Sequence, residues 1–215
     1  MFNFGLLTSG GGDFTSRLMI WLPIFLVSIT LHEFGHAYTA YRLGDQTPKL
    51  DGRLSLNPIA HLDPIGTLMI LFGPIGWAKP VRVDPRALKG RYAELMVALA
   101  GPLANLILAV IAVLVLKHAP IPGAYDGLIE PLQVMLMLNL ALAVFNLLPI
   151  PPLDGGNILQ NLLPYRWRPA YYQIMPYGVI VLVLLVLGPM FVPGMPSVLG
   201  MLMRQALDFL LWIVP

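Results

Sequence analysis

The chain has 215 residues, of which 57% are hydrophobic and only 11% are charged. Because soluble domains carry about 25% charged residues, this composition excludes an ordinary soluble protein and indicates an integral membrane protein. The formal net charge of +2 is too small to suggest a nucleic-acid partner, and the absence of cysteine excludes disulfides and thiolate chemistry.

Four segments are apolar and long enough to span a bilayer, which takes about 20 residues. They are residues 18–41, 92–116, 131–150 and 172–193. A fifth apolar segment, residues 196–214, is interrupted by Arg204 and Asp208, so it is either a further span or an amphipathic helix at the interface. We therefore expect an all-α polytopic membrane protein with about four to five transmembrane helices. The N-terminus does not resemble a signal peptide, so the first span is expected to act as the insertion signal.

One more apolar segment, PIGTLMILFGPIGW at residues 64–77, is short for a span and contains five Gly or Pro residues. Such a composition disfavours a helix. We predict a short re-entrant β-hairpin or loop at about residues 64–83. Non-helical backbone at that depth must be covered by protein or must line a wet cavity.

The basic residues predict the orientation of the chain. Of the 13 Lys and Arg residues, eight lie between Arg42 and Arg91, whereas residues 117–130 contain only Lys117. Since loops rich in Lys and Arg stay in the cytoplasm, residues 42–91 and 151–170 are expected inside, and the N-terminus and residues 117–130 outside. This parity holds only if residues 64–77 do not cross the membrane.

The first span contains the sequence HEFGH at residues 32–36. On a helix, His32 and His36 lie on one face with their Cβ atoms about 5–6 Å apart, a spacing at which two imidazoles can bind one zinc ion. Glu33 follows the first ligand directly, as the general base does in the H-E-x-x-H pattern of zinc proteases. Because ionisable groups are costly inside a membrane, a catalytic metal site is favoured over a polar pair buried for helix packing.

A catalytic zinc site needs a third protein ligand and an open position for water. Asp154 directly follows the third span, in FNLLPIPPLDGG, so its expected depth matches that of HEFGH. His118 is expected in an outer loop, far from the inner end of the first span. The residues favour Asp154 as the third ligand over a turn-forming role, and they leave His61 open as a second candidate.

In combination, these motifs resemble the site-2 proteases, the intramembrane zinc metalloproteases of class M50. The resemblance covers most of the chain and rests on HEFGH, NPIAHLDPIGTL, GWAKPV, AGPLANL and NLLPIPPLDGGNIL, at residues 32–36, 57–68, 76–81, 100–106 and 146–159. The chain is similar to compact prokaryotic members without a PDZ or CBS domain. One domain over residues 1–215 is expected, with a catalytic core at 18–160 and further helices at 171–214. Many members carry a spanning helix before the one with HExxH; no such helix is expected here, because seventeen residues before residue 18 are too few for one.

The resemblance implies that His32, His36 and Asp154 bind one Zn²⁺ per chain and that Glu33 activates the attacking water. Asn146 matches a family asparagine that helps to bind the substrate or the developing oxyanion. Bonding to a neighbouring helix is the alternative role of this residue.

Two further motifs match the family. Gly101 is expected to permit close helix approach, and Asn105 is expected to brace the core rather than to take part in the chemistry. His61 and Asp63 match the NPxxHxDPxG stretch, and a structural role in the re-entrant loop is expected for them, with support of the metal site as the alternative.

The implied function is regulated intramembrane proteolysis, which is the hydrolysis of peptide bonds within or near the transmembrane segments of membrane proteins. The expected location is the plasma membrane of a prokaryote, with the active site near the cytoplasmic face, and the expected partners are the lipid bilayer and a transmembrane substrate. A scaffold or chaperone that keeps the fold without hydrolysis is the main alternative, but such a protein is expected to lose Glu33 or a ligand. A zinc transporter would need polar residues along a path through the bilayer, and the second and third spans carry few.

Overall fold

The computed structural model describes residues 14–66, 78–119, 127–192 and 194–214. Its longer helices are α2 (Phe14–Arg42), α5 (Ala93–His118), α6 (Ile129–Asn146), α9 (Gly178–Phe191) and α10 (Val198–Ile213). Its shorter elements are the helices α3 (Thr47–Leu50), α7 (Asp154–Leu162) and α8 (Arg168–Ile174) and the 3-10 turns η1 (Pro58–Ala60), η3 (Tyr165–Trp167) and η4 (Met175–Tyr177). Within the described ranges the only extended pairing is an isolated antiparallel bridge between Leu62 and Ala78, so the expected all-α architecture is confirmed.

Among the described residues, four helical segments are long and apolar enough to cross a membrane. They are Leu18–Arg42 within α2, Ala93–His118 (α5), Ile129–Asn146 (α6) and Tyr165–Phe191, which contains α8 and α9. The chain is therefore a multi-pass membrane protein. The fifth apolar segment forms α10, whose 16 residues span about 24 Å, short of the roughly 30 Å hydrocarbon core. The structure thus favours a short packed helix over a further span.

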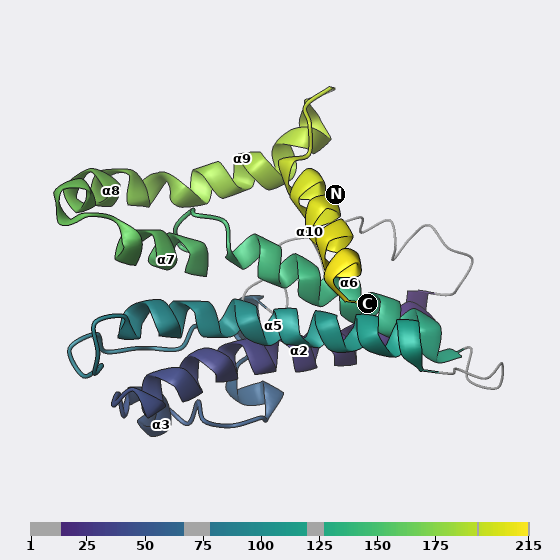
Figure 1. The fold of residues 1–215 in the computed structure, drawn as a ribbon, viewed down its shortest axis with the longest axis horizontal. Helices are drawn as coiled ribbons and strands as arrows, with labels where there is room; N and C mark the ends of the chain where they lie inside the picture. Colours follow the sequence, from purple (N-terminus) through teal and green to yellow (C-terminus); the bar gives the residue numbers. More distant parts are fainter. Residues whose placement is uncertain (1–13, 67–77, 120–126, 193, 215) are drawn as a thin grey trace.

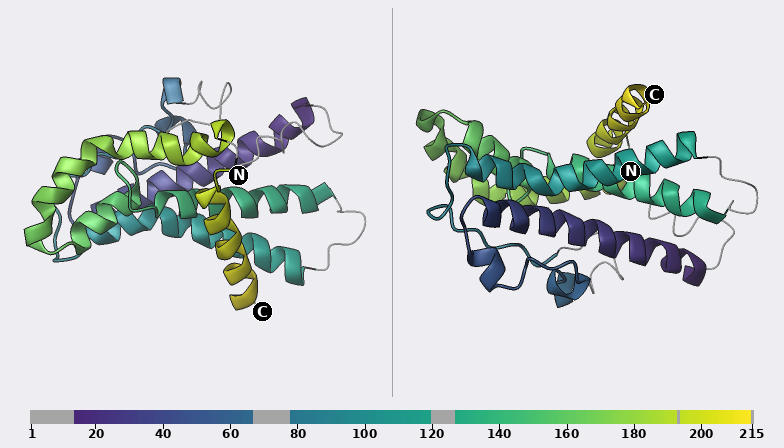
Figure 2. Two further views of the ribbon diagram at one scale, coloured as in Figure 1. Left: turned by 90° about the horizontal axis from the view of Figure 1, so that it is seen from above. Right: turned by 60° about the horizontal axis from the view of Figure 1, so that its bottom comes forward.

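The centre of the protein is a bundle of α2, α5 and α6, in which α5 contacts both other helices (Figure 2). Small, fully buried side chains occur on all three helices: Ala37, Ala40, Ala109, Ala112 and Ala141. Apolar surface gains little by leaving lipid, so transmembrane helices associate through close packing, which small residues permit. This bundle is the rigid frame on which HEFGH is carried.

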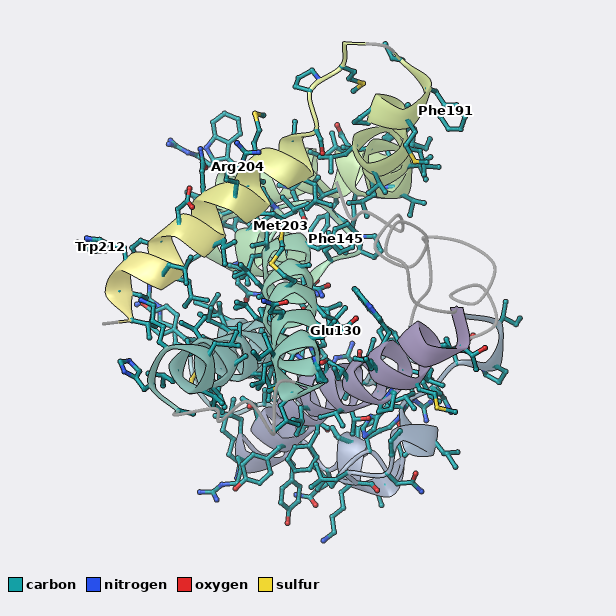
Figure 3. The ribbon with its side chains drawn as sticks, turned by 90° about the vertical axis from the view of Figure 1, so that its right-hand side faces the viewer. Glu130, Phe145, Phe191, Met203, Arg204 and Trp212 are labelled. Atoms are coloured by element: carbon teal, nitrogen blue, oxygen red, sulfur yellow. The ribbon has the colours of Figure 1, made fainter. Side chains whose placement is uncertain are left out.

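The helix α10 crosses α6 at a steep angle (Figure 1). Its buried residues join a cluster with α5 and α6 that contains Ala109, Ala112, Val113, Leu136, Leu140, Leu210 and Val214. Figure 3 shows Met203 directed toward α6, whereas Arg204 and Trp212 point away from the bundle. This burial of one face explains why α10 is amphipathic.

Lys117 fastens the end of α10 to the bundle. From the last turn of α5, its Nζ donates to the carbonyls of Leu211 and Val214, at 2.8 and 2.6 Å. The last carbonyls of a helix have no partner within the helix and carry partial negative charge, so a lysine is a favourable cap.

The connection between α6 and α7 places Asp154, and glycine makes its close packing feasible. A Cβ at Gly156 would lie 2.9 Å from the backbone nitrogen of Pro151, and a Cβ at Gly155 would lie closer still to the carbonyl of Leu148. The Tyr171 hydroxyl from α8 donates to the Gly156 carbonyl at 2.8 Å. The two glycines of LDGG therefore let the start of α7 fold tightly against this connection.

The segment between α2 and α5 is organised by buried polar side chains. The buried Asp45 carboxylate accepts hydrogen bonds from the backbone N–H groups of Thr47 and Asp84, both at 2.8 Å. Burial opposes ionisation of Asp45, but the hydrogen bonds from Thr47 and Asp84 outweigh it and hold its pKa below the ordinary value. Asp51 and Arg82 form an exposed ion pair, and the hydrogen bond from the guanidinium lowers the pKa of Asp51.

Most of the expected re-entrant loop or hairpin at 64–83, namely residues 67–77, lies outside the described residues. On its flanks the backbone N–H of Lys79 donates to the His61 carbonyl at 2.9 Å, next to the bridge between Leu62 and Ala78. The chain therefore closes a loop at this point, and the hairpin itself stays a prediction.

Candidate metal centre

Three side chains suited to metal binding converge from two elements that are distant in sequence. His32 and His36 lie on α2, and Asp154 is the first residue of α7. The Nε2 atoms of the two histidines are 3.2 Å apart, and Asp154 Oδ2 lies 3.3 Å from His32 Nε2 and 3.2 Å from His36 Nε2. The three atoms therefore form a nearly equilateral triangle, with both histidines buried and Asp154 nearly so.

The hydrogen bonds of the outer ring nitrogens show which nitrogen faces the triangle without a proton. His36 Nδ1 is 2.7 Å from the Val97 carbonyl, which can only accept, so in the neutral ring the proton lies on Nδ1. His32 Nδ1 is 2.7 Å from Asn105 Oδ1, which likewise accepts. Both neutral imidazoles thus direct an unprotonated Nε2 at the carboxylate of Asp154.

This arrangement fits a zinc ion. Within the described part of the chain, Asp154 Oδ2 is buried without a hydrogen-bond donor, so two lone pairs and a carboxylate oxygen face one another. The two Nε2 atoms and Asp154 Oδ2 are all electron-rich, so they need a positive charge between them. A tetrahedral ion about 2.0–2.1 Å from each ligand requires ligand atoms about 3.3 Å apart, which is the size of the observed triangle.

Gly101 leaves the room that this centre needs. A Cβ at this position of α5 would lie 2.7 Å from His32 Nε2 and closer still to His36 Nε2. A Cβ at Gly35 on α2 would lie 2.8 Å from the carbonyl of Ala100. The two glycines therefore let α2 and α5 meet at the metal centre, which is the role expected for Gly101 from the sequence.

The centre lies near the end of the bundle where α2 ends and α5 begins. His36 is six residues from the end of α2, about 9 Å along the axis, and Val97 is four residues, about 6 Å, into α5. Asp154 reaches the same level from the connection after α6. The expectation that HEFGH and LDGG share one depth is thus met by direct contact.

Glu33 and Asn146 face the same cavity as the three ligands, a space of about 700 Å³. Glu33 is buried beside the ligands, whereas Asn146 lies at the end of α6 and donates from Nδ2 to the Leu142 carbonyl at 3.0 Å. Ala78, Pro80, Val81, Val83 and Pro85 line the cavity, as do Glu94 and the amides Asn157, Gln160 and Asn161. The cavity therefore brings the candidate ligands and base together with the apolar segment around residues 78–85 and with the amides of α7.

The remaining sequence-derived candidates separate into two groups. Asn105 is fully buried and contacts the metal centre directly, through its bond to His32 Nδ1. His61 is also fully buried, but its Nε2 contacts the Ser55 carbonyl at 2.7 Å, and it is not among the residues that line the cavity. In the structure His61 supports the segment after α2, and the third potential ligand is Asp154.

Sequence reasoning did not assign Asn139, Ser28 or Val97 to the site. Asn139 and Ser28 are 0% and 1% exposed and bond to Asn105 or to each other. The signal for Asn139 was a polar residue inside an apolar span, but its partner was not apparent. Val97 acts through its backbone carbonyl, so the contact cannot be predicted from the identity of its side chain.

Comparison with known proteins places this geometry in a family. The sequence profile of Peptidase family M50 matches residues 20–122 and 117–188, which together make up most of the chain. The chain belongs to peptidase family M50. Members of this family are metalloproteases, so the chain is assigned to the hydrolases, in agreement with the expectation from its motifs.

The relatives carry consistent names. The chain is 47% identical over 181 residues to YwhC of Bacillus subtilis, a candidate zinc metalloprotease, over 80% of this chain and 83% of that protein. It is 35% identical over 171 residues to Rip2 of Mycolicibacterium smegmatis, another candidate zinc metalloprotease, over 77% of this chain and 65% of that protein. It is 30% identical over 160 residues to the zinc metalloprotease MJ0392 of Methanocaldococcus jannaschii, over 73% of this chain and 39% of that protein. No solved structure matches the chain significantly.

Proposed function

We propose that the protein is an intramembrane zinc protease of the site-2 type, which hydrolyses peptide bonds within or near transmembrane segments of other membrane proteins. One observation carries the proposal: three converging ligand atoms face the same cavity as the Glu33 carboxylate, and both histidines and Glu33 lie on a helix long enough to span a membrane. Residues 18–160 form the catalytic core, with residues 171–214 as additional helices and one zinc ion per chain.

The orientation follows from charge. Eight of the 13 Lys and Arg residues lie between Arg42 and Arg91, beside the end of the bundle that carries the metal centre. By the positive-inside rule this end faces the cytoplasm of a prokaryotic cell, and the N-terminus lies outside. Water can therefore reach the site from the cytoplasmic side.

When bound by His32, His36 and Asp154, zinc supplies a Lewis acid that polarises the scissile carbonyl. Glu33 accepts a proton from the attacking water as the new carbon–oxygen bond forms. It then delivers that proton to the amide nitrogen as the carbon–nitrogen bond breaks. Asn146 uses one N–H on the Leu142 carbonyl, and among the described residues its amide has no other partner, so its second N–H can donate to the substrate or the developing oxyanion.

The substrate has to be extended at the scissile bond, because the amides of a helix are covered and bonded within the helix. Val81 and Val83 line the cavity, and within the described residues the backbone groups of Val81–Val83 form no backbone–backbone hydrogen bond. An extended substrate can pair with such an edge as an added strand. We therefore assign Val81–Val83 as the backbone template for the substrate.

Glu94 provides a recognition group among the residues that line the cavity. It is exposed, one helical turn before Val97 on α5, and within the described residues it forms no ion pair. One turn is about 5 Å, which corresponds to one or two residues of an extended substrate. Since transmembrane proteins carry Lys and Arg at the cytoplasmic ends of their spans, Glu94 suits a basic residue just beyond the cleaved bond.

The test is cleavage of a single-span model substrate by the purified protein in lipid, together with zinc content. The Glu33→Gln protein is expected to keep its zinc and to lose cleavage by a factor of about 100 or more, because only the proton acceptor is removed. The His32→Ala protein should lose both. The matched control is Glu130→Gln, the same change in the first turn of α6, at the end of that helix away from Asn146 and the cavity. It should behave like the parent.

Two results would contradict the proposal. Robust cleavage by purified Glu33→Gln protein would remove Glu33 from the role of base. Full zinc affinity in both Asp154→Asn and Asp154→Ala would show that another residue is the third ligand.

A further inference from the structure

A chain of hydrogen bonds runs from the metal centre into the bundle and involves residues with no place in the proposed chemistry. Asn105 Nδ2 donates to Asn139 Oδ1 at 2.9 Å and to the Ser28 carbonyl at 3.2 Å. Asn139 Nδ2 donates to Ser28 Oγ and to the Met135 carbonyl, both at 2.9 Å. The side chains come from α2, α5 and α6, so this series of hydrogen bonds joins all three helices of the core.

The direction of every bond in this chain is determined by its surroundings. The carbonyls of Met135 and Ser28 can only accept, so the Nδ2 atoms of Asn139 and Asn105 must face them. Asn139 then presents Oδ1 to Asn105, and Asn105 presents Oδ1 to His32 Nδ1. An acceptor at that point requires the proton of His32 on Nδ1.

We propose that Asn139 and Ser28 are positioning residues for the metal centre: together with Asn105 they hold the His32 imidazole in the Nδ1-protonated form, with Nε2 free to bind zinc. The inference rests on the proposed zinc site. If Asn105 could rotate its amide, its Nδ2 would face His32 and favour a proton on Nε2, where it competes with the metal. Asn139 and the Ser28 carbonyl prevent that rotation.

The two histidines achieve the same orientation by different means. His36 Nδ1 meets a backbone carbonyl, that of Val97, which needs no further support. His32 meets a side-chain amide, which could present either its oxygen or its nitrogen. Asn105 and Asn139 are both 0% exposed, and burying polar groups in membrane spans is costly. This cost is explained if their arrangement decides whether the Asn105 amide presents its oxygen or its nitrogen to His32.

A purely structural alternative is that the asparagines only bind the helices together, since polar bonds across helices stabilise membrane bundles. The positioning role and the purely structural role predict different effects on zinc affinity when both asparagines are replaced. If Asn139 acts on zinc through Asn105, removing Asn139 has no further effect on zinc affinity once Asn105 is gone. If both only stabilise the bundle, their effects on zinc are independent.

The experiment measures zinc affinity of the full chain by competition with a chromophoric chelator, alongside thermal unfolding. Asn105→Leu should weaken zinc binding about 10–100-fold, the usual effect of removing a partner of a metal ligand. Asn139→Leu, one bond further away, should weaken it about 3–10-fold, and the double variant should match Asn105→Leu alone. If Asn139→Leu does not fold, Asn139→Ala takes its place with the same expected coupling.

Thr30→Val is the matched control. Thr30 is buried on α2 two residues from His32, and within the described residues its hydroxyl has no hydrogen-bond partner, so zinc affinity should not change. Parent-like zinc affinity in a folded Asn139 variant, or losses that multiply in the double variant, would overturn the proposal. His32→Ala tests the zinc site separately from the positioning role: if this variant binds zinc as the parent does, the proposed zinc site itself is wrong.

Discussion

Gly101→Ala is the most direct test of the proposed metal centre, because it adds one methyl group beside both candidate histidine ligands. The new Cβ would lie 2.7 Å from His32 Nε2 and closer to His36 Nε2. Non-bonded atoms need about 3.5 Å, so His32 has to move by about 0.8 Å and His36 by more. Metal sites tolerate only about 0.2 Å in ligand distances.

The expected result is a loss of zinc affinity of at least about 100-fold, with cleavage lost in parallel, since a misplacement of about 1 Å costs a catalytic site about that factor. The folded state should survive, because alanine is favoured over glycine within a helix by about 1 kcal/mol. Zinc affinity is measured by chelator competition, and stability by thermal unfolding with excess chelator.

Gly127→Ala is the matched control, since a Cβ there has no described neighbour within 4 Å. It should bind zinc as the parent does. Parent-like zinc affinity in Gly101→Ala would refute the geometry, because the ligand atoms could not then lie where the structure has them.

Three further predictions concern other parts of the chain. Asp45→Asn should cost about 1–3 kcal/mol in unfolding free energy at pH 7, since one of two buried acceptors is lost. Because the pKa of Asp45 is lowered in the folded state, its stabilising contribution is present above the unfolded pKa of about 3.9 and is lost as the pH falls through the folded pKa. Thermal unfolding should therefore show a larger loss of stability between pH 7 and pH 3 for the parent than for Asp45→Asn, and equal losses would contradict this. Lys117→Met should expose the backbone amides of the last turn of α10 to hydrogen exchange without changing zinc affinity, and unchanged exchange would mean that the cap is unimportant. Glu94→Lys should reverse a preference of about 2–5-fold, the value of an exposed ion pair, for substrates with Lys rather than Glu beyond the cleaved bond; an unchanged preference would remove Glu94 from substrate recognition.

Much of the fold was determined by local sequence. The spans follow from apolar runs of sufficient length, because lipid offers no partner for an unpaired backbone. The first three helical segments agree with the predicted spans within four residues, whereas the fourth begins seven residues earlier, at Tyr165. HEFGH supplied two candidate ligands because residues four apart share one face of a helix. For residues 196–214, packing favours an amphipathic helix over a further span, since α10 has only 16 residues and buries one face on the bundle.

Contacts between helices were decided by tertiary structure alone. The sequence left Asp154 and His61 as alternatives, because depth along the membrane does not fix rotation or lateral position; folding brings Asp154 to the histidines and buries His61 against Ser55. Asn105 was expected to brace the core, with support of the site as the alternative, and the sequence did not show that its contact is His32, because the register of α5 against α2 sets its neighbour. The sequence by itself thus determined which elements form and which chemistry they carry, whereas the packing of α2, α5 and α6 decided which side chains share the site.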